Sequence, residues 1–124
     1  MSVPPALAEL PFCYLTTTGR ISGRPHRIEI WFALWEGTVY LLSGGRDEAD
    51  WVRNLLVAPV VTLELGAEVR TPTARVLAPA SEEDALARRL LVEKYQPGYG
   101  EDLRGWGRSA LPVAIAWDAA APQS

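Results

Sequence analysis

Residues 16–32 read Thr-Thr-Thr-Gly-Arg-Ile-Ser-Gly-Arg-Pro-His-Arg-Ile-Glu-Ile-Trp-Phe, and they connect two segments that both have the composition of strands. This connection carries more positive charge than a simple chain reversal needs. Its two glycines allow backbone conformations closed to other residues and leave room for a ligand. Arg20, Arg24 and Arg27 supply planar, permanently charged donors for phosphate or carboxylate oxygens. The stretch therefore predicts an anion-binding connection between two strands.

The length and composition predict one globular domain over residues 1–124, with flexible ends at 1–10 and 118–124. Of the 124 residues, 48% are hydrophobic and 22% are charged, which argues against disorder. The net charge of −3 argues against a nucleic-acid partner, because phosphate backbones are bound by a surplus of Lys and Arg. Any positive surface is therefore local, and residues 20–27 form the best candidate.

Cys13 and His26 are the only cysteine and histidine, so a zinc site and an internal disulfide are not expected. No stretch is long and apolar enough to span a membrane, and the sequence predicts a cytoplasmic protein. A serine-histidine-acid triad would have to use His26, but no carboxylate is placed to orient it. His26 is better interpreted as a structural or ligand-contacting group.

Short segments rich in β-branched and aromatic residues predict six antiparallel strands, at residues 12–18, 26–35, 38–43, 60–65, 69–77 and 113–117. Two inserted helices are expected, one from about 48 to 57 capped by Asp47, the other over 81–95 after a capping box at Ser81. Residues 95–111 are expected to be a long loop with a functional role. Hairpins without βαβ alternation indicate a closed or split barrel in a mainly β, α+β fold.

Alternation along residues 26–35 places one apolar face toward the core and leaves Trp31 and Trp35 on the other. That second face mixes charged and aromatic groups, as a ligand or subunit interface would. Each tryptophan taken alone is more often a core residue than a ligand contact.

A second glycine segment, Ser43-Gly44-Gly45-Arg46, ends a strand and precedes the first helix. Backbone N–H groups at the start of a helix bind anions, so the chain offers two separate glycine-and-arginine elements. A long phosphorylated cofactor would use both. Trp51 and Asn54, three residues apart on the helix, are placed to close one side of such a pocket.

Five motifs together resemble the deazaflavin-dependent nitroreductase family, and they extend over nearly the whole chain. They are Leu15-Thr16-Thr17-Thr18-Gly19-Arg20-x-Ser22-Gly23-Arg24-Pro25, Tyr40-Leu41-Leu42-Ser43-Gly44-Gly45, Asp50-Trp51-x-x-Asn54-Leu55, Pro59-x-Val61-Thr62 and Ala74-Arg75. The resemblance implies a six-stranded split β-barrel of the flavin-reductase type, a homodimer, and coenzyme F420 as cofactor.

The resemblance also implies roles for particular residues. The phosphate and acidic tail of F420 would be held by Arg20, Ser22, Gly23, Arg24, His26 and Arg27. The deazaflavin ring would lie against Ser43, Gly44 and Gly45, with Trp51 and Asn54 on the helix beside it. Tyr95, Tyr99 and Trp106 would form the acceptor side. Ile21 stands where family members often carry Lys or Arg.

The chemistry implied is hydride transfer from reduced F420 to an electron-poor acceptor such as a quinone, an enone or a nitroaromatic. Ser43 is the candidate for polarising the ring or the substrate, and Tyr95 or Tyr99 for supplying a proton. Two alternatives stay open from the residues: a non-catalytic protein that carries F420 or a flavin, and an FMN-dependent split-barrel reductase.

Overall fold

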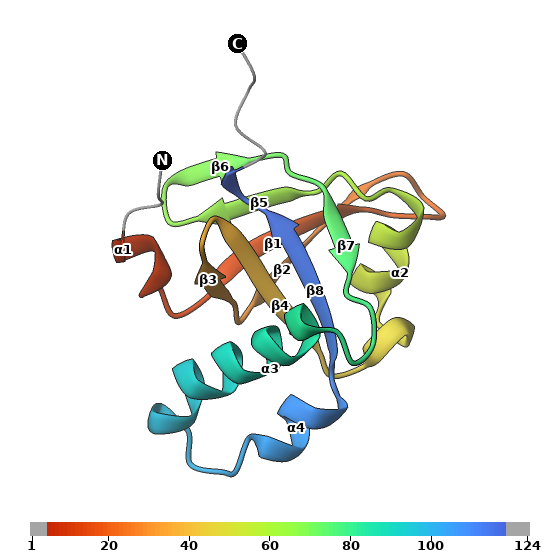
Figure 1. Cartoon of the computed structure of the whole chain (residues 1–124). Helices are drawn as coiled ribbons and strands as arrows, with labels where there is room; N and C mark the ends of the chain where they lie inside the picture. The colour runs from red at the N-terminus through yellow and green to blue at the C-terminus, as the bar shows by residue number, and fades with distance from the viewer. Residues whose placement is uncertain (1–4, 119–124) are drawn as a thin grey trace.

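The computed structural model describes residues 5–118 and contains two antiparallel four-stranded sheets packed face to face (Figure 1). The strands are β1 (Cys13–Thr18), β2 (Pro25–Ile30), β3 (Ala33–Trp35), β4 (Thr38–Ser43), β5 (Thr62–Leu65), β6 (Glu68–Arg70), β7 (Ala74–Val76) and β8 (Leu111–Ala116). One sheet has the order β2-β1-β5-β6 and the other the order β3-β4-β8-β7. Residues 1–4 and 119–124 of the predicted flexible ends lie outside the described residues.

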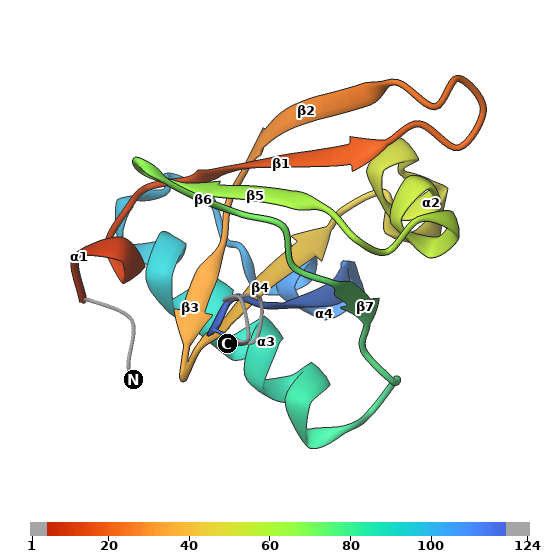
Figure 2. The same ribbon diagram turned by 90° about the horizontal axis from the view of Figure 1, so that it is seen from above.

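The helices lie on one face and at both ends of this pair of sheets (Figure 1). They are α1 (Pro5–Ala8), α2 (Asp50–Val57), α3 (Glu82–Tyr95) and α4 (Arg104–Ser109), with 3-10 turns η1 (Arg46–Glu48) and η2 (Gln96–Gly98). The helices α3 and α4 lie outside the second sheet, and α2 lies at one end of the molecule near the connection between β1 and β2, with α1 at the opposite end (Figure 2). Within residues 5–118, no helix has the length and apolar character that crossing a membrane requires.

Two apolar clusters account for this layering. The first lies between the sheets and includes Leu15 and Leu63 from one sheet and Leu41 from the other. The second lies between the second sheet and α3 and includes Leu42 and Leu91. Strand β4 contributes to both clusters because it is covered on both faces. A strand covered in this way is a continuous hydrophobic run rather than an alternating one.

The α+β class and the antiparallel pairing are confirmed, but the prediction of six strands is wrong. The segment 26–35 forms two strands, β2 and β3, which belong to different sheets. The chain changes sheets at Phe32, whose backbone N–H donates to the Tyr95 hydroxyl (3.0 Å) and whose carbonyl accepts from Lys94 (2.9 Å). Lys94 and Tyr95 both belong to α3. Because they bond to the backbone of Phe32, the chain can leave the first sheet there without leaving a buried N–H or carbonyl group unpaired.

The predicted strand at 69–77 also divides, into β6 at the edge of one sheet and β7 at the edge of the other. Pro72 lies between them and has no N–H for a ladder. Its carbonyl accepts from the N–H of Val61 (2.9 Å), and the N–H of Ala74 donates to Pro59 (2.8 Å). The chain thus crosses from one sheet to the other at Pro72.

The helices agree with the sequence in part. Ser81 caps α3 by accepting from the N–H of Asp84 (3.1 Å), as the capping box predicts. Asp47 does not cap α2, which starts after Ala49. The buried residues of α2 are Val52, Asn54 and Leu55, whereas Leu56 is 58% exposed. A polar residue replaces a leucine on the inner side because the connection between β1 and β2 hydrogen-bonds there.

The expected loop at 95–111 contains η2 and α4. Glycine is a poor helix former, so its frequency in this segment favours a loop. Gly107, however, has a packing role in α4. A Cβ at this position would lie 2.5 Å from Val92 Cγ2 on α3. The missing side chain therefore lets α4 approach α3 closely, at the cost of a weak intrinsic helix propensity.

Candidate functional site

The connection between β1 and β2 is a compact turn built on its glycines. The N–H of Gly19 donates to the Arg24 carbonyl and that of Gly23 to the Gly19 carbonyl, both at 2.8 Å. Gly23 has φ +72°, a left-handed conformation that favours glycine. Ser22 Oγ accepts from the N–H of Arg24 (3.1 Å), which fixes the turn further.

Gly19 is needed for a different reason, which is close approach. A Cβ at this position would lie 2.7 Å from both His26 Nε2 and Ser22 Oγ. The imidazole and the hydroxyl thus gather over the bare backbone of Gly19. This arrangement brings two polar groups together that are four residues apart in the sequence.

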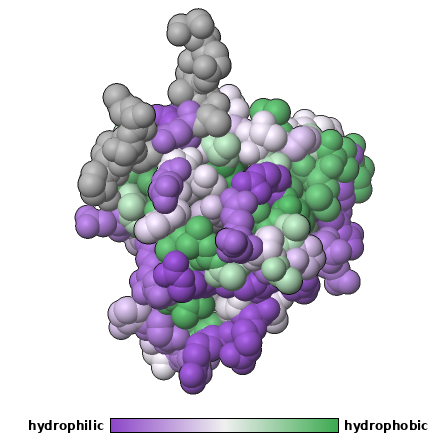
Figure 3. Space-filling model, in the orientation of Figure 1, coloured by the Kyte–Doolittle hydropathy of each residue, from purple (hydrophilic) through white to green (hydrophobic). Residues whose placement is uncertain are grey.

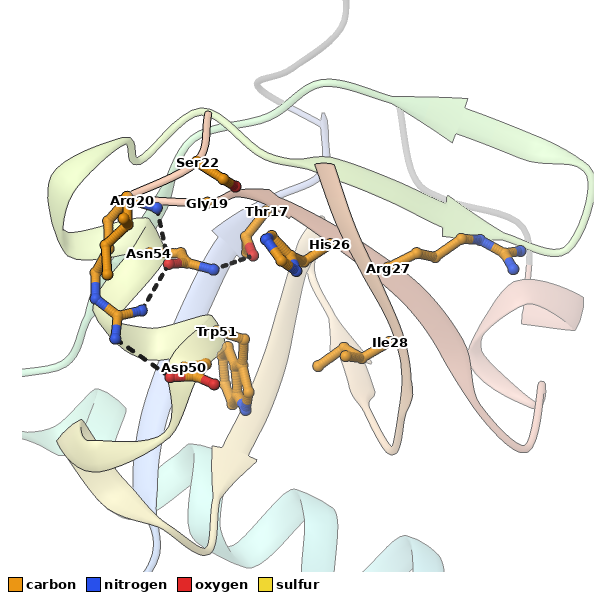
Figure 4. A pocket seen from close by; sticks show the side chains of 11 residues that line it. Thr17, Gly19, Arg20, Ser22, His26, Arg27, Ile28, Asp50, Trp51 and Asn54 are labelled. Atoms are coloured by element: carbon orange, nitrogen blue, oxygen red, sulfur yellow. Dashed lines mark hydrogen bonds and ion pairs between the residues drawn. The ribbon is translucent and has the colours of Figure 1, made fainter. Parts of the chain in front are cut away.

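Asn54 joins the turn to α2 (Figure 4). Its Oδ1 accepts from the backbone N–H (3.1 Å) and from Nη1 (2.9 Å) of Arg20, and its Nδ2 donates to Thr17 Oγ1 (3.1 Å). Arg20 Nη2 lies 3.3 Å from Asp50 Oδ1, and the Asp50 side chain is exposed to solvent. One buried amide therefore sets the position of the arginine nearest the turn.

These groups line a pocket of about 480 Å³, which we call the hairpin pocket. Its lining residues are Thr17, Gly19, Arg20, Ile21, Ser22, His26, Arg27, Ile28, Asp50, Trp51 and Asn54. Of the predicted cofactor residues, the structure brings Arg20, Ser22, His26, Trp51 and Asn54 together with their side chains around this space (Figure 4).

Arg27 borders the hairpin pocket, but its guanidinium points away from the other labelled side chains (Figure 4). It forms an ion pair with Glu64 (2.9 Å) and lies 3.8 Å above the ring of Tyr14. This pairing lowers the pKa of the Glu64 carboxyl and raises that of Arg27. The structure thus places Arg27 on the outer face of the sheet, where alternation along β2 directs it.

Five further predicted residues are not among the lining residues of the hairpin pocket: Gly23, Arg24, Ser43, Gly44 and Gly45. Gly23 and Arg24 belong to the turn itself. Ser43 is 2% exposed, and its hydroxyl donates to the carbonyl of Arg46 (2.9 Å). The glycine segment leads into η1 and not directly into α2, so the expected helix start at these glycines is wrong.

A second pocket, also of about 480 Å³, lies between β2 and the segment before β8. We call it the aromatic pocket, and its lining residues are Glu29, Ile30, Trp31, Leu42, Tyr99, Glu101, Asp102, Leu103 and Trp106. The Trp31 ring meets the rings of Tyr99 and Trp106 edge to face, at centroid distances of 5.5 and 5.7 Å. Of the two alternatives for this face, a ligand or a subunit interface, the half-buried ring of Trp31 therefore fits the ligand alternative, because it lines a pocket.

The two pockets are neighbours in the fold. Ile28 lines the hairpin pocket, and Ile30, on the same face of β2, lines the aromatic pocket. A Cβ at Gly44 would be 3.7 Å from Trp106 Nε1, which is ordinary contact. The glycine segment thus runs from the wall of the aromatic pocket toward α2 and Trp51.

Tyr95 stacks on Trp31, at 4.2 Å between ring centroids. Its hydroxyl lies 2.8 Å from the Pro11 carbonyl oxygen and 3.1 Å from that of Phe32. Burial raises the pKa of this hydroxyl to about 12. Tyr99, in contrast, is 44% exposed and borders the aromatic pocket. Of the two tyrosines, only Tyr99 lines the aromatic pocket.

Sequence reasoning gave no individual role to Thr17, Ile28 and Asp50, which also line the hairpin pocket. Thr17 carries a usable signal, because it continues the inward positions of Cys13 and Leu15 along β1. A hydroxyl at a core-facing position is typical of a group that needs a polar partner. Asp50 had no such signal, since only the folded chain places it against Arg20.

Comparisons with known proteins show the family of this chain. Residues 2–118 match the family model described as F420H(2)-dependent quinone reductase. A solved structure described as an F420-H2 dependent reductase (FDR-A) is similar over 85% of this chain and 93% of its own, with 24% identity and a TM-score of 0.69.

Two further solved structures share the fold. One, described as a domain-swapped dimer, has 24% identity and a TM-score of 0.69, covering 85% of this chain and 79% of its own. The other, described as a putative pyridoxamine 5'-phosphate oxidase from Listeria innocua, has 18% identity and a TM-score of 0.64, covering 90% and 86%. The resemblance seen in the sequence motifs is thereby confirmed.

Proposed function

Because the chain belongs to the F420H2-dependent quinone reductase family, we propose that the hairpin pocket holds the anionic tail of F420 and that the aromatic pocket receives the quinone. Family membership makes the protein an F420H2-dependent reductase, with F420 rather than FMN as its cofactor. When bound, reduced F420 supplies the hydride that the quinone accepts. The assignment of each residue below is part of the proposal.

The main support for this proposal is that several hydrogen-bond donors meet in the hairpin pocket. Arg20, Ser22 and His26 all line the same space, and the missing side chain of Gly19 lets the Ser22 hydroxyl and the His26 imidazole come together. A guanidinium, a hydroxyl and an imidazole suit the oxygens of a phosphate or carboxylate. Asp50 forms an ion pair with Arg20. Because this ion pair is exposed and contributes little free energy, an anionic ligand can replace Asp50 as the partner of Arg20.

The ring of the cofactor fits best along the glycine segment between the two pockets. Trp51 on α2 lies at one end of this region, and Trp106 on α4 borders Gly44 at the other. Gly44 and Gly45 are exposed and carry no side chain, so a flat ring can approach the backbone closely. Ser43 supports the segment through its bond to Arg46 rather than by facing the ligand.

Reduction of a quinone to a hydroquinone takes one hydride and one proton, so a proton donor is needed beside the acceptor. We assign this role to Tyr99, since the Tyr95 hydroxyl is bonded to backbone carbonyls. The exposed fraction of Tyr99 leaves its hydroxyl open to solvent, which restores the proton after each turnover. Tyr95 instead orients Trp31 by stacking on it.

The test titrates the purified chain with F420 and with FMN, and then adds menadione to the reduced complex. F420 should bind and its reduced form should be oxidised. Tyr99→Phe should lower kcat several-fold with F420 affinity unchanged, whereas Tyr95→Phe should mainly lower stability, by about 1 kcal/mol. Binding of FMN alone, or F420 binding without turnover, would contradict the proposed function.

The proposal includes a homodimer. Leu56, Val57 and Val60 are all more than half exposed, and the space-filling view shows an apolar area on the side where α2 lies (Figure 3). Apolar surface of this kind is typical of protein interfaces. Light scattering on the purified chain tests it, and a monomer at micromolar concentration would refute it. A cytoplasmic location stays a prediction.

A further inference from the structure

The two pockets carry opposite charges. The hairpin pocket is lined by two arginines and a histidine against one aspartate, Asp50. The aromatic pocket is lined by three carboxylates, Glu29, Glu101 and Asp102, and by no lysine, arginine or histidine. Both pockets have a volume of about 480 Å³ and border β2, but they differ in charge.

The three carboxylates are not equally free. Asp102 accepts from Arg104 (2.9 Å), and this pairing lowers its pKa to about 2. Glu29 accepts only a neutral partner in the described residues, the Tyr14 hydroxyl at 3.2 Å. The side chain of Glu101 has no hydrogen bond or ion pair within residues 5–118. At least two negative charges at the aromatic pocket therefore lack a cation bonded to them.

From this arrangement we propose that the carboxylates of Glu29 and Glu101 determine the acceptor class, admitting neutral or cationic planar quinones and rejecting anionic ones. The proposal rests on the proposed function only in taking the aromatic pocket as the acceptor site. The cavity and its aromatic wall of Trp31, Tyr99 and Trp106 supply the affinity for a flat ring. The carboxylates add selectivity through repulsion, as specific sites often do.

The same repulsion has a use for an enzyme with an anionic cofactor. The tail of F420 and a flat acceptor must occupy neighbouring sites without exchanging places. Positive groups around the hairpin pocket attract the tail, while the negative aromatic pocket keeps it out. Charge thus directs the anionic tail to one pocket and the uncharged acceptor to the other.

The experiment measures equilibrium binding to the cofactor-free chain, by quenching of tryptophan fluorescence, since Trp31 and Trp106 border the pocket. The probes are menadione, a sulfonated naphthoquinone, and a naphthoquinone carrying a trimethylammonium group of similar bulk. At about 10 mM salt the sulfonated quinone should bind roughly tenfold more weakly than the cationic one, with the ratio falling toward about two at 0.3 M salt.

The double variant Glu29→Gln/Glu101→Gln should bring this ratio close to one, after circular dichroism confirms that it is folded. Glu82→Gln, at the start of α3 and outside both pockets, is the matched control and should keep the full ratio. Equal affinities of the parent chain for the two charged quinones at low salt would overturn the proposal. So would a ratio unchanged in the double variant. A chain that binds quinones selectively but does not oxidise reduced F420 would instead contradict the proposed function alone.

Discussion

Replacing Asn54 by Ala tests the connection between the turn and α2 most directly. Three hydrogen bonds would be lost, two from Arg20 and one to Thr17. The donors of Arg20 are partly exposed and can be rehydrated, so each should contribute about 0.5–1 kcal/mol. Thr17 is 1% exposed, and leaving its hydroxyl without this partner should cost a further 1–2 kcal/mol. The expected loss in the free energy of unfolding is about 3 kcal/mol, a large fraction of a typical domain's stability.

The assay is urea unfolding followed by tryptophan fluorescence and circular dichroism. The midpoint should fall with little change in the slope m, because the unfolded chain exposes the same surface. Arg53→Ala, an exposed neighbour on the same helix, is the control and should change stability by less than about 0.5 kcal/mol. F420 affinity should also fall, by at least about tenfold, since Arg20 loses its position.

A double-mutant cycle with Thr17→Val measures the interaction between Asn54 and Thr17 directly. Thr17→Val alone should destabilise by about 1 kcal/mol because it leaves the Asn54 amide unpaired. In the Asn54→Ala background the same change should be neutral or stabilising by up to about 1 kcal/mol, because it removes the unpaired hydroxyl, and the coupling energy should therefore be about 1–2 kcal/mol. Additive losses, or a loss below about 1 kcal/mol for Asn54→Ala, would show that the amide does not join the two segments.

Gly19→Ala should lower F420 affinity about tenfold while changing stability by less than about 1 kcal/mol, because a Cβ would displace the mobile side chains of His26 and Ser22 rather than backbone. Gly105→Ala, where a Cβ meets nothing within 4 Å, is its control in the same fluorescence titration, and equal effects of the two would contradict this prediction. Burial lowers the pKa of Lys94 from 10.5 to about 8, so above pH 8 the unfolded state binds a proton that the folded state has released. The parent chain should therefore gain stability relative to Lys94→Met between about pH 8 and 9.5, and a stability difference independent of pH in urea unfolding would refute this.

Structural elements could be predicted from the sequence where all the residues that define them lie in one short segment. The turn after β1 was predicted because its glycines and arginines are contiguous, and α3 because Ser81 and Asp84 form their cap within one turn. The buried face of β1 follows from alternation, since Cys13, Leu15 and Thr17 are all buried. The family itself could be read from five short motifs in order.

Features that depend on residues distant in the sequence could be seen only in the folded chain. Residues 26–35 read as one strand, yet the backbone of Phe32 bonds to Tyr95 and Lys94, more than sixty residues away. Alternation predicts which side of a strand faces inward, but not where a strand exchanges one sheet for another. That choice depends on partners supplied by a packed helix.

The site divides in the same way. A turn suited to anions, a glycine segment and an aromatic segment could each be predicted from the sequence, because each is a matter of local composition. Only the folded chain showed that Asn54 positions Arg20, that Arg27 pairs with Glu64 on the outer face, and that Tyr95 is bonded to backbone. It also showed that Glu29 and Glu101 meet at one pocket, since hydrogen bonds and electrostatic forces act over a few ångströms of space and not over positions in a sequence.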